Sequence, residues 1–272
     1  AALIVLEDDT VTPPADAAAV TWAQRRCREL GLSGVRADAI PLRIWQRGPA
    51  MARLLQPEAR PLAMAALGNS GAAPPEGLEA DVAWYPDLAA LKADGDSPEN
   101  SRAAGCIVFI DQRTERTRDG SGYGRAVAAR FAGPAEAARR GAVAVGIRSI
   151  GTDHDSVPHT GATRYDLRLP RIPAFAVSVA DAELIAAHHA AGRMLRMQLK
   201  LDARSDVDAL THNVIADVPG TDLAHEVVLI GAHLDTWDVG PGALDDGAGV
   251  AIVMAAAAKI ARARVRPRRT IR

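Results

Sequence analysis

One stretch of the chain concentrates side chains that could bind a metal. Residues 231–249 hold His233 and, interleaved with glycines, four aspartates: Asp235, Asp238, Asp245 and Asp246. Imidazole and carboxylate groups are good ligands for a borderline cation such as zinc. So many acidic side chains in one short loop would repel one another unless a cation neutralised part of their charge. The composition of this stretch therefore indicates a metal site.

Two spacings within the stretch suggest individual roles. Asp235 lies two residues after His233, where its carboxylate could bind the ring nitrogen that does not face the metal and so fix the tautomer. Asp245 and Asp246 directly precede an apolar segment, where acidic residues also favour the positive end of a helix. Spacing alone leaves both interpretations open: a metal site, or a solvated turn with helix-capping aspartates.

The segments on either side of this stretch predict a parallel α/β unit. Residues 226–231 predict a buried strand, and residues 248–261 predict a helix of small apolar residues. A strand, a polar loop and a helix form the repeating unit of a parallel sheet, in which ligands bind at the carboxyl ends of the strands. The candidate ligands fall on such a loop.

The rest of the chain predicts further α/β structure. A helix is expected from Asp16, as its cap, to Gly31, and the prolines of residues 35–75 favour short strands and turns. Residues 202–208 are polar and predict a connector. Between these segments we expect strands at 82–85, 106–110, 142–147, 172–179 and 195–201, and helices at 134–140 and 181–192.

Composition excludes several classes of protein. The 272 residues are 48% hydrophobic and carry 32 basic and 33 acidic side chains, so a packed core is expected and a global attraction to nucleic acid or anionic membrane is not. Two cysteines, Cys27 and Cys106, exclude a disulfide scaffold and a thiolate zinc finger, although they could still pair. No apolar stretch approaches the ~18 residues of a membrane span. The apolar start, residues 1–6, lacks the basic region of an intact signal peptide.

The loop and its flanks resemble the two-zinc exopeptidases. Residues 213–261 contain Val-Val-Leu-Ile-Gly-Ala-His-Leu-Asp-Thr-Trp-Asp-Val-Gly and then Ala-Leu-Asp-Asp-Gly-Ala-Gly. They are most similar to the plasma glutamate carboxypeptidase (carboxypeptidase Q)-like branch. Residues 118–124 and 158–161 resemble the protease-associated domain inserted in that branch, and residues 16–30 and 45–50 resemble its N-terminal part. The resemblance covers nearly all of the chain.

The resemblance implies an α/β fold with two domains. The expected architecture is a zinc exopeptidase-type mixed sheet with helices on both faces, interrupted by a protease-associated α/β domain. Residues 1–75 and 206–272 would belong to the peptidase domain, and residues 76–205 would form the insert. Glycines 120, 122 and 124 do not have the spacing of a dinucleotide fingerprint, and a tight loop near the cleft is the simpler interpretation.

The resemblance also implies roles for individual residues. His233 resembles the ligand of one zinc, and Asp245 resembles the carboxylate that bridges two zincs. Asp235 resembles the carboxylate that orients His233, and Asp246 resembles the residue that follows the bridge across a cis peptide. His159 lies in a Pro-His-Thr-Gly context shared with the branch. It could help to shape the substrate cleft, although a structural role is the simpler interpretation of each histidine outside the loop.

Part of the family's site has no counterpart in the sequence. The family uses a later pair of glutamates, one as general base and one as zinc ligand, and then an aspartate and a histidine as further ligands. None of these can be matched before Arg272. We therefore expect the chain to be the N-terminal portion of an enzyme, ending inside the peptidase domain, with an incomplete site if nothing follows.

The function that these observations predict is a zinc-dependent exopeptidase. It would cleave dipeptides or short peptides with a free N-terminus through a water that bridges two zinc ions. A secreted or periplasmic location follows from the resemblance, and homodimer formation stays open. The competing interpretation is a non-catalytic remnant whose protease-associated module binds a peptide or partner. The arginines between residues 262 and 269 fit a solvated helix end better than a nucleic-acid surface.

Overall fold

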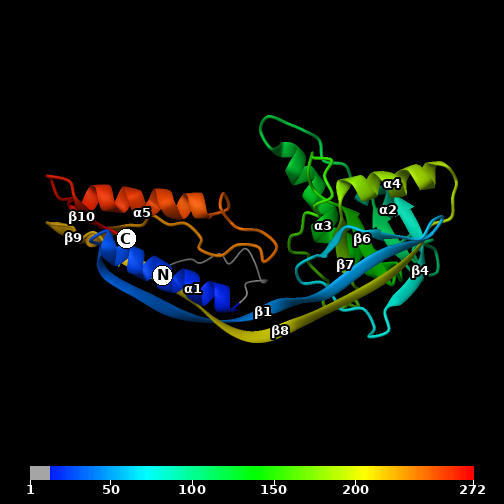
Figure 1. Ribbon diagram of the computed structural model, residues 1–272, viewed down its shortest axis with the longest axis horizontal. Coiled ribbons are helices and arrows are strands. Elements are labelled where there is room, and N and C mark those ends of the chain that lie inside the picture. The colour runs from blue at the N-terminus through cyan, green and yellow to red at the C-terminus, as the bar shows by residue number, and fades with distance from the viewer. Residues whose placement is uncertain (1–12) are drawn as a thin grey trace. The chain divides into compact units, whose positions relative to one another are not determined.

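The computed structural model describes residues 13–272, and side chains from residue 15 onward. The prediction about residues 1–6 lies outside the described residues. The chain divides into two compact units (Figure 1). Unit 1 comprises the residues up to Ile44 together with Asp206–Arg272, and unit 2 comprises Trp45–Ser205. The predicted insert, residues 76–205, lies within unit 2, and its identity as a protease-associated domain stays a prediction.

Two very long strands contribute to both units. They are β1 (Ser33–Gln56) and β8 (Arg196–Asp217), which are neighbours in one eight-stranded sheet. The turns predicted within residues 35–75 and the connector predicted at residues 202–208 are therefore partly wrong. Pro41 and Pro49 lie outside the ladder between β1 and β2, which covers only residues 52–54 of β1. Half-buried and exposed residues alternate through residues 203–210, as a strand requires.

Unit 1 surrounds the candidate metal loop with two helices and a pair of parallel strands. The elements are α1 (Pro13–Glu29), β9 (Leu223–Val228), α5 (Gly247–Ala261) and β10 (Arg269–Ile271). The predicted helix at residues 248–261 is confirmed. The strand predicted at residues 226–231 begins and ends earlier and is not buried: Val227 and Val228 are 47% and 43% exposed. Among the described strands, β9 pairs only with β10, which leaves much of its side-chain surface in contact with solvent.

The first helix begins before its predicted cap. Pro13 opens α1, because its fixed φ and missing N–H suit the first turn of a helix. Asp16 lies inside that turn, and its carboxylate accepts a hydrogen bond of 2.9 Å from the Thr211 hydroxyl. The predicted end is confirmed: Gly31 has a φ of +80°, and the Leu32 amide bonds the Cys27 carbonyl.

Unit 2 is built on four parallel strands. The sheet order is β2-β1-β8-β4-β5-β6-β7-β3. Neighbours among β4, β5, β6 and β7 are parallel, β3 is antiparallel to β7, and β8 is antiparallel to β4. These short strands are β2 (Arg60–Leu62), β3 (Met64–Ala66), β4 (Leu78–Tyr85), β5 (Ile107–Ile110), β6 (Ala144–Arg148) and β7 (Ala174–Val177). β4, β5, β6 and β7, together with the first part of β8, confirm the predicted strands of the middle block, and β2 and β3 are short strands of the kind predicted within residues 35–75.

Helices cover both faces of the unit 2 sheet. They are α2 (Leu88–Ala93), α3 (Ser121–Arg139) and α4 (Val179–Ala190). Side chains of β5 alternate between two hydrophobic clusters: Ile107 and Phe109 belong to one, and Val108 and Ile110 belong to the other. Ile185 of α4 joins the first cluster, whereas α2 and α3 supply residues to the second. Because successive strand residues point to opposite faces, α4 covers one face and α2 and α3 cover the other.

Two helix starts in unit 2 differ from the prediction. α3 begins at Ser121 and not at Pro134, so the predicted loop at residues 120–124 is the first turn of this helix. Gly120 precedes it with a φ of +76°. α4 is capped by Ser178, whose hydroxyl accepts from the amide of Asp181 at 3.1 Å. Asp181 is not the cap because its carboxylate accepts hydrogen bonds from the Ala63 amide and from Arg60.

A buried tyrosine gives unit 2 a predictable response to alkali. Tyr85 is fully buried and donates a hydrogen bond of 2.7 Å to the Asp94 carboxylate. Burial and this hydrogen bond raise the pKa of Tyr85 to about 12. Above pH 10 the unfolded chain loses the phenol proton first, so the free energy of unfolding falls as pH rises towards 12. The loss amounts to roughly 2–3 kcal/mol.

Urea unfolding between pH 9 and pH 11.5 measures this loss. The Tyr85→Phe variant is expected to be less stable at pH 9, but to lose less stability with rising pH than the wild type. All other titrating groups are common to the two proteins, so the difference in slope isolates Tyr85. Equal slopes for the two proteins would contradict the prediction.

Candidate metal centre

His233 lies in the loop between β9 and α5, where the structure brings three predicted residues together. Its Nε2 atom is 2.9 Å from the Oδ1 atom of Asp245. Its Nδ1 atom is 3.0 Å from the main-chain carbonyl oxygen of Asp235 and 3.3 Å from that residue's carboxylate. The His233 side chain is 28% exposed, that of Asp235 is 8% exposed, and that of Asp245 is 78% exposed.

The contacts of the imidazole ring favour a positive charge between His233 and Asp245. A carbonyl oxygen only accepts hydrogen bonds, so Nδ1 carries a proton and donates it to Asp235. In the neutral ring, the lone pair of Nε2 would then face a carboxylate oxygen, and two acceptors need a proton or a metal ion between them. Burial lowers the pKa of His233, but the Asp235 carbonyl and the nearby carboxylates outweigh burial and raise it overall.

Asp246 joins the loop to α5. Its carboxylate caps the helix by accepting from the Gly249 amide at 3.0 Å, and its other oxygen accepts from the His233 amide at 3.3 Å. A Cβ atom on Gly249 would lie 2.1 Å from that carboxylate, so the cap requires glycine there. The peptide bond between Asp245 and Asp246 is cis. The sequence left open whether these aspartates cap the helix or belong to a metal site. In the structure Asp246 caps the helix, and Asp245 faces His233.

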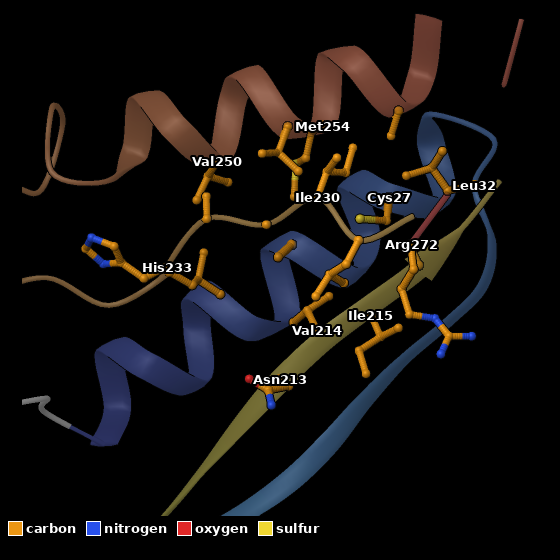
Figure 2. Close-up of a pocket in the computed structure, with 18 of the residues that line it drawn as sticks. Cys27, Leu32, Asn213, Val214, Ile215, Ile230, His233, Val250, Met254 and Arg272 are labelled. Atoms are coloured by element: carbon orange, nitrogen blue, oxygen red, sulfur yellow. The ribbon is translucent and has the colours of Figure 1, made fainter. Parts of the chain in front are cut away.

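A cavity of about 460 Å³ adjoins the loop within unit 1. Figure 2 shows α1 and α5 on either side of the segment that carries Ile230 and His233. The cavity is lined mainly by apolar side chains, among them Val214, Val250 and Met254. His233 and Asp235 also contribute to the lining. One candidate metal ligand, His233, therefore borders a space that could receive an apolar group.

His159 belongs to unit 2. Its amide donates to the Ser149 hydroxyl at 2.8 Å, and its ring meets the edge of the Tyr123 ring at 6.3 Å. Desolvation and the charge of Arg130 lower the pKa of His159. His159 and the loop residues belong to different units, and a role for His159 in shaping a substrate cleft stays a prediction.

Comparisons with known proteins identify the segment that carries the loop. Residues 213–272 match the model of peptidase family M28. This segment belongs to peptidase family M28. The M28 segment includes β9, the loop with His233, Asp235 and Asp245, and both α5 and β10.

Similarity to M28 peptidases extends along the chain. The chain is 35% identical to carboxypeptidase Q of Bos taurus over 254 residues, which are 93% of this chain and 52% of the relative. It is 42% identical to a peptidase M28 precursor from Shewanella amazonensis, with a TM-score of 0.91 over 98% of this chain and 59% of that chain. A zinc aminopeptidase from Bacillus subtilis, 18% identical, shares the fold with a TM-score of 0.63 over 97% of this chain and 56% of that one. The chain spans about half the length of the curated relatives it matches.

The chemistry of the M28 loop fits zinc. His233 and Asp245 offer the nitrogen and oxygen ligands that zinc takes in proteins. Two ligands about 2.0–2.1 Å from a tetrahedral ion lie about 3.3 Å apart, close to the observed 2.9 Å. Across residues 13–272, no group of three or more His, Cys, Asp or Glu side chains is placed to hold a metal ion. His233 and Asp245 are therefore a candidate pair of ligands, and no third side chain of these types joins them within the described residues.

Other properties bear on the wider predictions. Cys27 and Cys106 are both free thiols. No helix within residues 13–272 is long and apolar enough to cross a bilayer. The sequence did not indicate that the main-chain carbonyl of Asp235 would be the nearest group to His233 Nδ1, because that contact depends on the path of an irregular loop.

Proposed function

We propose that this chain is part of a zinc-dependent exopeptidase that cleaves dipeptides or short peptides with a free N-terminus. One observation carries the proposal: His233 Nε2 and the Asp245 carboxylate face each other at 2.9 Å, within a segment of family M28. The same two groups would hold zinc. When bound, zinc supplies Lewis acidity to polarise a peptide carbonyl and to acidify water.

The residues of the loop prepare this site. The main-chain carbonyl of Asp235 accepts a hydrogen bond from Nδ1 of His233, which leaves the lone pair of Nε2 for a metal. Asp246 anchors the loop to α5 and, through the His233 amide, fixes the backbone beneath the imidazole. Asp245 is 78% exposed, so its second carboxylate oxygen remains open to another ion. This exposure supports the proposal of two zinc ions that share Asp245.

Peptide hydrolysis by the natural protein tests the proposed activity. That protein is expected to hydrolyse unblocked dipeptides, to lose this activity when a chelator removes zinc, and to regain it when zinc returns. N-acetylated dipeptides, which lack the free N-terminus, are expected to resist cleavage. The His233→Ala variant is expected to be inactive, whereas His225→Ala, which removes an exposed histidine of β9, serves as the matched control.

Two results would contradict the proposal. Hydrolysis that persists without metal would exclude zinc as the catalyst, and equal cleavage of blocked peptides would exclude an exopeptidase that requires a free N-terminus. Binding of peptides without hydrolysis would favour the competing function, a non-catalytic binding module. A secreted or periplasmic location is part of the proposal and rests on resemblance to the family.

A further inference from the structure

Unit 2 contains a buried arginine that meets no carboxylate. Arg130 lies in α3 and is 6% exposed. The two other buried arginines of this unit are each paired at 2.7 Å, Arg140 with Glu136 and Arg148 with Asp111. Within the described part of the chain, Arg130 forms no ion pair. Because removing a charge from water is costly unless it is compensated, an unpaired buried guanidinium needs an explanation.

The partners of the Arg130 guanidinium are neutral and distant. Its Nη2 atom donates to the Tyr123 hydroxyl at 3.2 Å, and its Nη1 atom donates to the Thr160 carbonyl at 3.3 Å. Its Nε atom is buried without any partner among the described residues. The rings of Tyr123 and Phe131 lie 6.0 Å and 5.3 Å from the guanidinium carbon. A guanidinium has five N–H donors, so this environment uses only part of its capacity.

Two exposed side chains border the same guanidinium. Tyr123 is 45% exposed, and its hydroxyl accepts from Arg130, so its own proton remains available to a ligand. His159 is an exposed residue whose ring meets the edge of the Tyr123 ring at 6.3 Å, and burial of the imidazole together with the charge of Arg130 lowers its pKa. A neutral imidazole offers one N–H donor. These three side chains gather donors around a positive charge and include no anionic acceptor.

We propose that Arg130, Tyr123 and His159 form a binding site for a carboxylate, such as that of a peptide or small organic acid. The planar guanidinium matches the two oxygens of a carboxylate, and charge-assisted hydrogen bonds of this kind are strong. One desolvated positive charge balances the single charge of a carboxylate better than the larger charge of a phosphate. All three residues belong to unit 2, so the site stands independently of zinc binding at His233.

Binding of small probes to the full chain tests this site, with the ring signals of His159 followed by NMR. N-acetylglycine is expected to bind saturably, and its neutral counterpart N-acetylglycinamide at least about tenfold more weakly, because it lacks the charge-assisted hydrogen bonds. The Arg130→Gln variant is expected to lose a similar factor. Arg164→Gln is the matched control, because Arg164 is exposed and stacks on the same Phe131 ring. Its affinity is expected to stay within about twofold.

A second variant keeps the test decisive if Arg130→Gln fails to fold. Tyr123→Phe removes only the hydroxyl of an exposed ring and is expected to weaken N-acetylglycine binding about threefold to tenfold. Unchanged affinity in both Arg130→Gln and Tyr123→Phe would overturn the proposal, as would equal binding of the neutral amide. Tighter binding of sulfate than of N-acetylglycine would show a general anion site and overturn the assignment to carboxylates. Stronger binding of N-acetylglycine than of N-acetylglutamate α-amide would identify a peptide C-terminus as the source of the carboxylate, and the reverse order would identify an acidic side chain.

Discussion

Replacing His233 by alanine is expected to lower the affinity of the chain for zinc by more than about 100-fold, a larger loss than removal of an outer-shell partner causes. The imidazole supplies one of the two ligands that the described residues offer, and its Nε2 atom already faces the other at 2.9 Å. Competition with a chromophoric chelator measures the affinity. His225→Ala is expected to bind zinc like the wild type, because His225 is exposed and lies in β9, outside the loop.

Substitutions around His233 separate ligands from supporting residues. Asp245→Asn is expected to weaken zinc binding nearly as much as His233→Ala, because a neutral amide is a poorer ligand than a carboxylate. Asp235→Asn is expected to cost less, about tenfold or somewhat more, because its main-chain carbonyl still accepts the Nδ1 proton. Equal zinc affinity in the His233→Ala variant and the wild type would contradict the assignment of His233 as a ligand.

Replacing Asp111 by alanine is expected to destabilise unit 2 by about 3–5 kcal/mol. Asp111 follows β5, Arg148 ends β6, and both side chains are at least 96% buried around an ion pair of 2.7 Å. Removing the carboxylate leaves the Arg148 guanidinium buried without its closest counter-charge. The remaining acidic neighbour, Glu183, lies 3.8 Å from the guanidinium and is 41% exposed, so it compensates the charge only weakly. Urea unfolding at pH 7 measures the change in the free energy of unfolding.

A double variant and a surface pair provide the controls. The Asp111→Leu/Arg148→Met variant removes both charges and is expected to recover most of the lost stability, because no charge remains buried. Asp81→Ala breaks an exposed pair with Arg196 and is expected to cost no more than about 1 kcal/mol. Burial raises the pKa of Asp111, and Arg148 acts against that effect. A loss below about 1 kcal/mol for Asp111→Ala would contradict the prediction, because the buried pair would then contribute no more than an exposed one.

Short apolar runs predicted much of the fold. The apolar runs that became β5, β6 and β7 were recognisable because strands covered on both faces have continuous hydrophobic sequences. The elements that differ from the prediction depend on tertiary context. Proline is common at the first position of a helix, but Pro134 lies inside α3. β1 and β8 continue through segments whose composition favours turns. Pairing of these two strands outweighs the local preferences.

The two candidate sites differ in how far the sequence could predict them. The metal loop places His233, Asp235, Asp245 and Asp246 within 14 residues, so residue type indicated a possible metal site, and the resemblance to the two-zinc exopeptidases implied the individual roles. The cluster around Arg130 joins α3 to a segment about 30 residues later. Its signal in the sequence, an arginine within an alanine-rich helix that holds two others, is also found in exposed helices. Only the burial of Arg130 and the absence of a carboxylate within the described residues distinguish it.

Long-range ¹H–¹⁵N NMR of the histidine rings tests the central claim most directly, namely that His233 binds zinc through Nε2. Spectra of the chain with and without zinc report the protonation and metal binding of each ring nitrogen. We predict that zinc shifts the Nε2 signal of His233 to a metal-bound value while Nδ1 keeps its proton, and that His225 is unaffected. A zinc-induced change at other histidines with none at His233, or no change at any ring, would contradict the claim.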